Sequence, residues 1–77
     1  MECAFSELLP GDHATVVDFR QANSPYRHRL LSLGVMPGTA FVVVRKAPMG
    51  DPVQIRVRGF DLCLRKHEAD ELMVDKR

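Results

Sequence analysis

Two consecutive runs of alternating residues constrain the fold of this chain more than any other feature. Residues 53–58 alternate apolar and polar side chains, and residues 60–65 repeat the pattern after Gly59. A period of two is typical of a half-buried β-strand, because successive side chains point to opposite faces of the sheet. The residues that should face the core are Val53, Ile55, Val57, Phe60, Leu62 and Leu64. We therefore predict two short strands here, with Cys63 pointing outward.

Other segments predict further strands and short helical turns. Residues 14–20 and 39–46 are rich in β-branched and aromatic side chains, which favour strands. Residues 72–74 resemble a short closing strand, whereas residues 3–9 and 66–71 suggest single helical turns. The expected total is about five strands.

Residues 24–33 carry the clearest helix signal. Ser24 can cap the first turn, Pro25 suits the first helical position, and Gly34 suits the residue after the last turn. The residues spaced to form one apolar face are Tyr26, Leu30 and Leu33. We predict that this face packs on the sheet and that Arg29 lies at its edge, partly exposed.

The fold class follows from these elements and from the length. A chain of 77 residues is enough for one domain and not two, so residues 1–77 are predicted to form a single domain. A small antiparallel sheet must hide its edges, and closing into a barrel does so. We predict an all-β fold with short helices: a small SH3-like antiparallel barrel of about five strands, with one helix inserted after the first strand.

The charge balance argues against nucleic-acid binding. Eleven basic and ten acidic side chains give a formal net charge of +1, which provides no overall field for nucleic acid or anionic lipid. A local group of basic residues does exist: Arg20, Arg27, His28, Arg29, Arg56 and Arg58. We interpret it as a solvated charged face, because the aromatic side chains are expected in the core and few remain to stack on bases.

No motif predicts catalysis, a cofactor or a metal site. The residues that could ligate a metal are scattered and lack ligand spacing: Cys3, His13, His28, Cys63 and His67. Residues 48–51 contain one glycine without a following Lys-Ser or Lys-Thr, so they predict a tight turn and not a phosphate loop. We expect the chain not to be an enzyme.

The sequence shows no pattern typical of a membrane span or a secretory signal. The longest apolar run, Ala40–Val44, is far too short to span a bilayer, and residues 1–9 lack the features of a secretory signal. The expected location is the cytoplasm, with both thiols reduced.

An ordered set of residues resembles the FeoA family over roughly residues 5–75. Gly11 and Val16 fit its opening strand. The later matching residues are Arg29, Leu30, Leu33, Gly34, Pro37, Gly38, Ala47, Pro48, Met49, Gly50, Asp51, Pro52, Leu62, Leu64, Arg65, Glu68 and Ala69. The resemblance implies an SH3-like barrel that supports ferrous iron uptake.

The same resemblance implies a partner and leaves one alternative open. The implied partner is the cytosolic part of a FeoB-like ferrous iron permease with a GTPase domain, which would recruit the chain to the inner face of the cytoplasmic membrane without membrane insertion. A related domain forms the C-terminal end of iron-dependent repressors. The alternative is therefore a stand-alone metal-responsive domain acting on a transcription factor or nucleic acid. Self-association also remains open.

The helix phase leads to a predicted protein-binding surface. If the apolar face packs on the sheet, Leu31 points away from it, on the same side as Arg27. In strand 39–46, Val42 should point outward if its two neighbours point inward. We predict that Leu31, Arg27 and Val42, extended by Met49 in the following turn, contribute to a docking surface.

Overall fold

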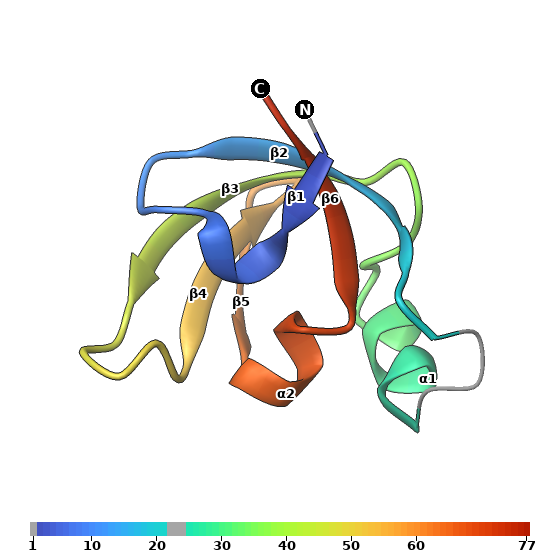
Figure 1. Ribbon diagram of the computed structural model, residues 1–77. Helices are drawn as coiled ribbons and strands as arrows, with labels where there is room; N and C mark the ends of the chain where they lie inside the picture. The colour runs from blue at the N-terminus through green and yellow to red at the C-terminus, as the bar shows by residue number, and fades with distance from the viewer. Residues whose placement is uncertain (1, 22–24) are drawn as a thin grey trace.

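The computed structural model describes residues 2–21 and 25–77, whose strands form one six-stranded antiparallel sheet (Figure 1). The strand order is β1-β6-β2-β3-β4-β5. The elements in chain order are β1 (Glu2–Ala4), the 3-10 helix η1 (Phe5–Glu7), β2 (His13–Phe19), α1 (Pro25–Ser32), β3 (Ala40–Lys46), β4 (Val53–Val57), β5 (Phe60–Leu64), α2 (Lys66–Ala69) and β6 (Leu72–Lys76).

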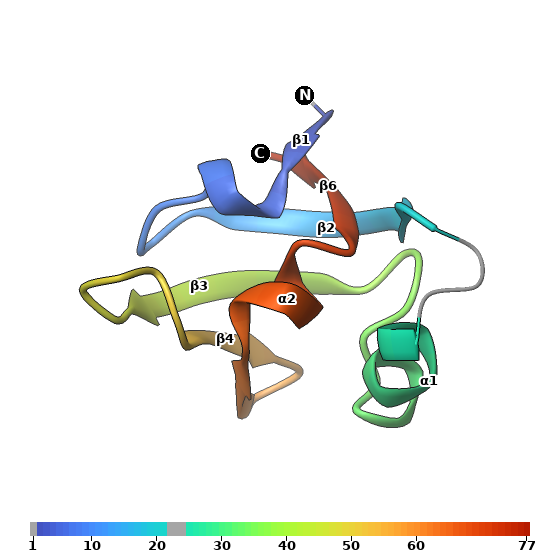
Figure 2. The same ribbon diagram turned by 60° about the horizontal axis from the view of Figure 1, so that its bottom comes forward.

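The sheet curls around a single apolar core. Figures 1 and 2 show β2 and β3 crossing the molecule, with β1 and β6 to one side and β4 and β5 to the other, and with α1 at one end. The buried apolar residues form one cluster: Phe5, Leu8, Ala14, Val16, Phe19, Leu30, Val35, Phe41, Val43, Val53, Ile55, Val57, Leu64, Ala69, Leu72 and Val74. The predicted class, an SH3-like all-β fold with short helices, is confirmed.

The N-terminal segment differs from the prediction of a helical turn over residues 3–9. Residues Glu2–Ala4 form strand β1, which pairs antiparallel with β6, and only Phe5–Glu7 turn into a short helix. This strand exists because β6 offers a partner, which no local pattern in three residues can reveal. It raises the number of strands to six and places the helix α1 after the second strand. Both chain ends lie close together on this β1–β6 side (Figure 1).

The two alternating runs behave differently. In β4 the three apolar residues are buried, as predicted. In β5, Leu64 is buried and Leu62 is half-buried, but Phe60 is 73% exposed, so the prediction that Phe60 faces the core is wrong. The strand extends past the end of the core toward the β4–β5 turn. Cys63 is exposed, as predicted.

Helix α1 begins and ends close to the predicted residues. Pro25 is its first residue, whereas the predicted cap Ser24 lies outside the described residues. At the other end, Gly34 has a positive φ of 90°, which favours glycine, and Val35 N–H donates to Leu30 O at 2.9 Å. The helix therefore turns back toward the sheet immediately after its last turn.

The inner face of α1 is centred on Leu30, which is fully buried. Tyr26, Leu31 and Leu33 are partly buried and pack against the core around it. The prediction that Leu31 points away from the core is therefore wrong, because the flank of this short helix is also covered. Leu33 was expected to be buried but is only half-buried, because it follows the last helical residue.

In the described part of the chain, no helix is long and apolar enough to cross a bilayer.

Candidate functional site

The structure places the four predicted docking residues on three segments: Arg27 and Leu31 on α1, Val42 on β3 and Met49 between β3 and β4. Met49 is 87% exposed in the β3–β4 connection, which lies at the opposite end of the molecule from α1 (Figures 1 and 2). Val42 is half-buried in β3 and pairs with His13 and Arg56. Arg27 is exposed on α1, where its guanidinium lies 5.7 Å from the centre of the Phe19 ring. The docking surface that includes all four therefore stays a prediction, with Met49 far from the two residues on α1.

A different apolar surface is created by the turn between β4 and β5. Arg58 and Gly59 both have positive φ, 52° and 84°, as the two central residues of a tight hairpin turn require. Val57 therefore pairs directly with Phe60. The short turn carries the Phe60 side chain out of the core and beside the end of α1.

The resulting hollow joins the hairpin to the end of α1. It has a volume of about 360 Å³, and its lining residues are Leu33, Gly34, Val57, Arg58, Phe60, Asp61 and Leu62. We call it the hairpin hollow. It combines an exposed aromatic ring and half-buried leucines with charged groups at the rim, an arrangement typical of the centre of a protein interface.

The acidic group at this rim is already neutralised. Asp61 accepts hydrogen bonds from Arg56 Nε at 2.8 Å and from Gln54 Nε2 at 3.0 Å. The hydrogen bond from Arg56 holds the pKa of Asp61 below its ordinary value, and the same bond raises the pKa of Arg56. Asp61 is thus ionised at neutral pH and already paired with a cation.

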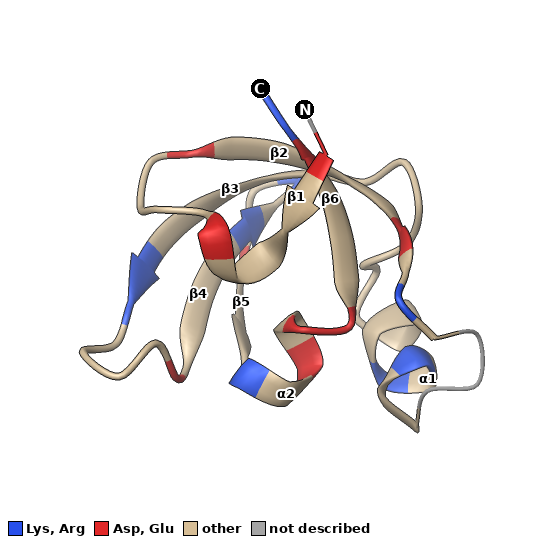
Figure 3. Cartoon of the chain, viewed as in Figure 1, with Lys and Arg blue, Asp and Glu red and all other residues tan. Residues whose placement is uncertain are grey.

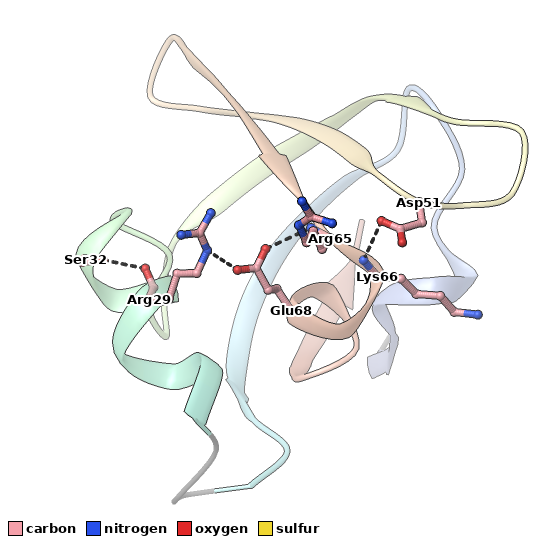
Figure 4. Close-up of polar contacts among 6 residues, drawn as sticks. All are labelled: Arg29, Ser32, Asp51, Arg65, Lys66 and Glu68. Carbon is pink, nitrogen blue, oxygen red and sulfur yellow. Dashed lines mark hydrogen bonds and ion pairs between the residues drawn. The ribbon is translucent and has the colours of Figure 1, made fainter.

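A polar bridge connects α1 to the start of α2 (Figure 4). Glu68, only 3% exposed, accepts a hydrogen bond on Oε1 from the backbone N–H of Arg65 at 3.0 Å, and its Oε2 forms an ion pair with Arg29 Nε. Ser32 Oγ donates to Arg29 O at 2.7 Å. The Glu68 carboxylate therefore holds two elements that are distant in sequence.

A second hollow lies beside this bridge. It has a volume of about 420 Å³ and is lined by Arg29, Asp51, Pro52, Cys63 and Arg65. We call it the bridge hollow. Asp51 accepts from the Lys66 backbone N–H at 3.1 Å, which fixes the β3–β4 connection against α2 (Figure 4).

Part of the sequence motif lines these two hollows: Leu33 and Gly34 the hairpin hollow, and Arg29, Asp51, Pro52 and Arg65 the bridge hollow. The first group lies on α1 and in the loop that follows: Arg29, Leu30, Leu33, Gly34, Pro37 and Gly38. The second group lies in the β3–β4 connection: Pro48, Gly50, Asp51 and Pro52. Leu64 and Arg65 lie at the end of β5. The role of Glu68 as a buried bridge was not predicted, although its position three residues after Arg65 is the spacing of a helix-capping carboxylate.

The side chains considered as metal ligands or as a nucleic-acid-binding face do not gather at one place. The three histidines are exposed on separate elements, β2, α1 and α2. Within residues 2–21 and 25–77, no three His, Cys, Asp or Glu side chains are grouped so that they could hold a metal ion. Figure 3 shows basic and acidic positions interspersed over most elements, and the basic residues do not gather on one face in this view.

Comparison with known proteins gives a consistent family. Residues 4–76 match the family model described as the FeoA domain. A Porphyromonas gingivalis protein, named as a fusion of Fe(2+) transport protein A with the Fe(2+) transporter FeoB, is 34% identical over 70 residues. The match covers 91% of this chain and only 8% of that protein.

Solved structures support the same family. A FeoA-like protein from Clostridium acetobutylicum is 32% identical, with a TM-score of 0.88 and coverage of 97% of this chain and 86% of that one. A FeoA from Stenotrophomonas maltophilia, solved with zinc and described as a prokaryotic SH3 domain protein, is 32% identical. Its TM-score is 0.78, and the match covers 95% of this chain and 89% of that one.

Proposed function

This chain belongs to the FeoA domain family, a family linked to ferrous iron transport, and we propose that it is a cytoplasmic accessory protein that binds the cytosolic part of a FeoB-like ferrous iron permease. The observation that carries the proposal is the relative in which a FeoA segment and FeoB form one polypeptide. A binding module joined covalently to a transporter in one protein is a natural partner of that transporter when the two are separate. Such a partner would hold the chain at the inner face of the membrane.

The proposed mechanism is binding without chemistry. A binding protein shifts its partner's conformational equilibrium by as much as its affinity differs between the two conformations. The hairpin hollow supplies the apolar contact that such binding needs, with Phe60 as an exposed aromatic anchor and Arg58 at the rim. The chain would tune iron uptake by favouring one state of the permease.

Co-purification with the full-length permease tests this function. We expect the wild-type chain to be retained by the solubilised permease, and radioactive ferrous iron uptake to fall in cells that lack the chain. Phe60→Ser should weaken both, because it removes the exposed aromatic ring. Leu9→Ser is the matched control, since Leu9 is 62% exposed but does not line the hairpin hollow. Normal uptake without the chain, together with no retention of the wild type, would refute the proposal.

A further inference from the structure

The outer edge of β5 is open to another strand. β5 is the last strand of the sheet and pairs only with β4 among the described strands. The two-residue turn makes Val57 and Phe60 a hydrogen-bonded pair, and hydrogen-bonded pairs recur at every second position of an antiparallel ladder. The backbone N–H and C=O groups of Asp61 and Cys63 therefore point away from β4. No backbone hydrogen bond ties them to another segment of the described chain.

The two hollows lie end to end along this open edge. The hairpin hollow is lined by the first half of β5, and the bridge hollow by Cys63 and Arg65. Each hollow is also lined from α1 or the residues directly after it, the hairpin hollow by Leu33 and Gly34 and the bridge hollow by Arg29. Asp51 and Pro52 complete the lining of the bridge hollow. The edge thus borders a trough that is apolar beside Phe60 and basic beside Arg65.

The charges along the trough select an acidic occupant. Asp61 is paired with Arg56 and Glu68 with Arg29, so these acids are neutralised. The third acid, Asp51, lines the bridge hollow and accepts on Oδ1 from the backbone N–H of Lys66. Arg58 and Arg65 are exposed, and within residues 2–21 and 25–77 no hydrogen bond or ion pair holds either guanidinium. At about 3.3 Å per residue, Phe60 and Arg65 are roughly 17 Å apart along the strand. Because the two residues are five positions apart, they lie on opposite faces of β5, and an extended segment would meet them with an apolar and an acidic side chain about five residues apart, also on opposite faces.

Resting on the proposed function, we infer that the permease docks an extended acidic segment on this edge as an additional antiparallel or parallel strand. Main-chain hydrogen bonds to Asp61 and Cys63 hold the segment, an apolar side chain enters the hairpin hollow, and an acidic side chain meets Arg65. Binding by strand addition obtains affinity from the main chain and specificity from such flanking pockets. Antiparallel pairing of two copies with Asp61 of one opposite Cys63 of the other would place Arg65 opposite Gly59, next to Arg58. These like charges disfavour a second copy in that register.

Hydrogen–deuterium exchange in the wild-type chain tests the inference directly. We expect the peptide spanning residues 60–65 to gain two slowly exchanging amides, those of Asp61 and Cys63, when the full-length permease is added in a lipid nanodisc. Peptides from β1 and β6, on the opposite side of the sheet, should not change. Binding without protection of residues 60–65 would overturn the inference and leave the proposed function standing. If the amides of residues 60–65 are protected without the permease, and the chain has twice its monomer mass in solution, the occupant of the edge is a second copy. That result would also overturn the inference.

Two pairs of variants complete the test. Cys63→Pro removes one outward N–H without touching the ladder to β4, a place where edge strands accept proline, and should weaken binding at least tenfold. Cys63→Ala keeps the N–H and should bind like the wild type. Arg65→Glu should weaken binding to a similar degree, whereas Arg20→Glu makes the same charge change beside β6 and should have little effect. Unchanged binding by folded Cys63→Pro and Arg65→Glu would refute strand addition; if Cys63→Pro fails to fold, the exchange result decides. No binding by the wild type would refute the proposed function itself.

Discussion

Two substitutions that break the same ion pair should have unequal effects on stability. Arg29→Met removes the cation and leaves the Glu68 carboxylate, whose side chain is 4% exposed, charged and without its partner. Glu68→Gln removes the anion and leaves Arg29, whose side chain is 59% exposed and can be hydrated. The glutamine Oε1 can still accept from the Arg65 N–H. The asymmetry comes from burial of one partner only.

The magnitudes follow from that burial. Removing one partner of a fully buried pair costs about 3–5 kcal/mol, and water that reaches the Arg29 side lowers this to about 2–3 kcal/mol for Arg29→Met. Glu68→Gln keeps the backbone hydrogen bond and loses only its ionic part, so we expect about 0.5–1.5 kcal/mol. For a domain of this size, 1 kcal/mol shifts the melting temperature by about 4–8 °C. Arg29→Met should therefore lower it by about 10–20 °C.

Thermal and urea unfolding followed by circular dichroism measures both effects. The double variant Arg29→Met/Glu68→Gln provides the decisive comparison, because it removes the cation and the buried charge together. It should be more stable than Arg29→Met alone. The reasoning is refuted if Glu68→Gln costs as much as Arg29→Met, or if the double variant is no more stable than Arg29→Met.

Three further predictions concern the core, the helix and the hairpin. Leu30→Ala should cost about 2–5 kcal/mol by urea unfolding, because Leu30 is fully buried; a cost below about 1 kcal/mol would show that the helix is not anchored there. Leu31→Asp should lower the melting temperature, since Leu31 packs against the core, and an unchanged value would restore the prediction that it points outward. The Arg56 hydrogen bond holds the pKa of Asp61 below 3.8, so its contribution to the hairpin is present above that pH and is lost as the pH falls through the lowered pKa. The protection factors of the amides in residues 53–64, which compare each exchange rate with the intrinsic rate at the same pH, should therefore fall in acid, and Asp61→Asn should remove that part of the pH dependence.

The sequence predicts which side of a strand a residue faces better than it predicts how far along the strand the buried core extends. Alternation assigned the inward residues of β4 correctly, because that strand crosses the core along its whole length. The same pattern failed at Phe60, since β5 begins at the turn, beyond the buried layer. A period of two records which side a residue takes, whereas burial depends on what other segments cover that side.

The candidate site illustrates the same division between local and tertiary information. The spacing of Arg65 and Glu68 is a local signal that indicates a helix cap. The pairing of Glu68 with Arg29 has no local signal, because it depends on how α1 packs against α2. Likewise, the helix period suggests that Leu31 lies at a flank, but only the tertiary packing decides whether that flank is covered.

The position of the chain ends bears on how tightly this protein must bind. Both ends lie on the β1–β6 side of the sheet, whereas the proposed docking edge is β5 at its other side. A transporter joined through either end would leave β5 free, and a short flexible linker would present the docking segment at an effective concentration of about millimolar. A fused protein could therefore work with a weak strand contact, while a separate chain needs an intrinsic dissociation constant near its own cellular concentration. We expect tighter strand contacts in separate FeoA chains than in fused ones.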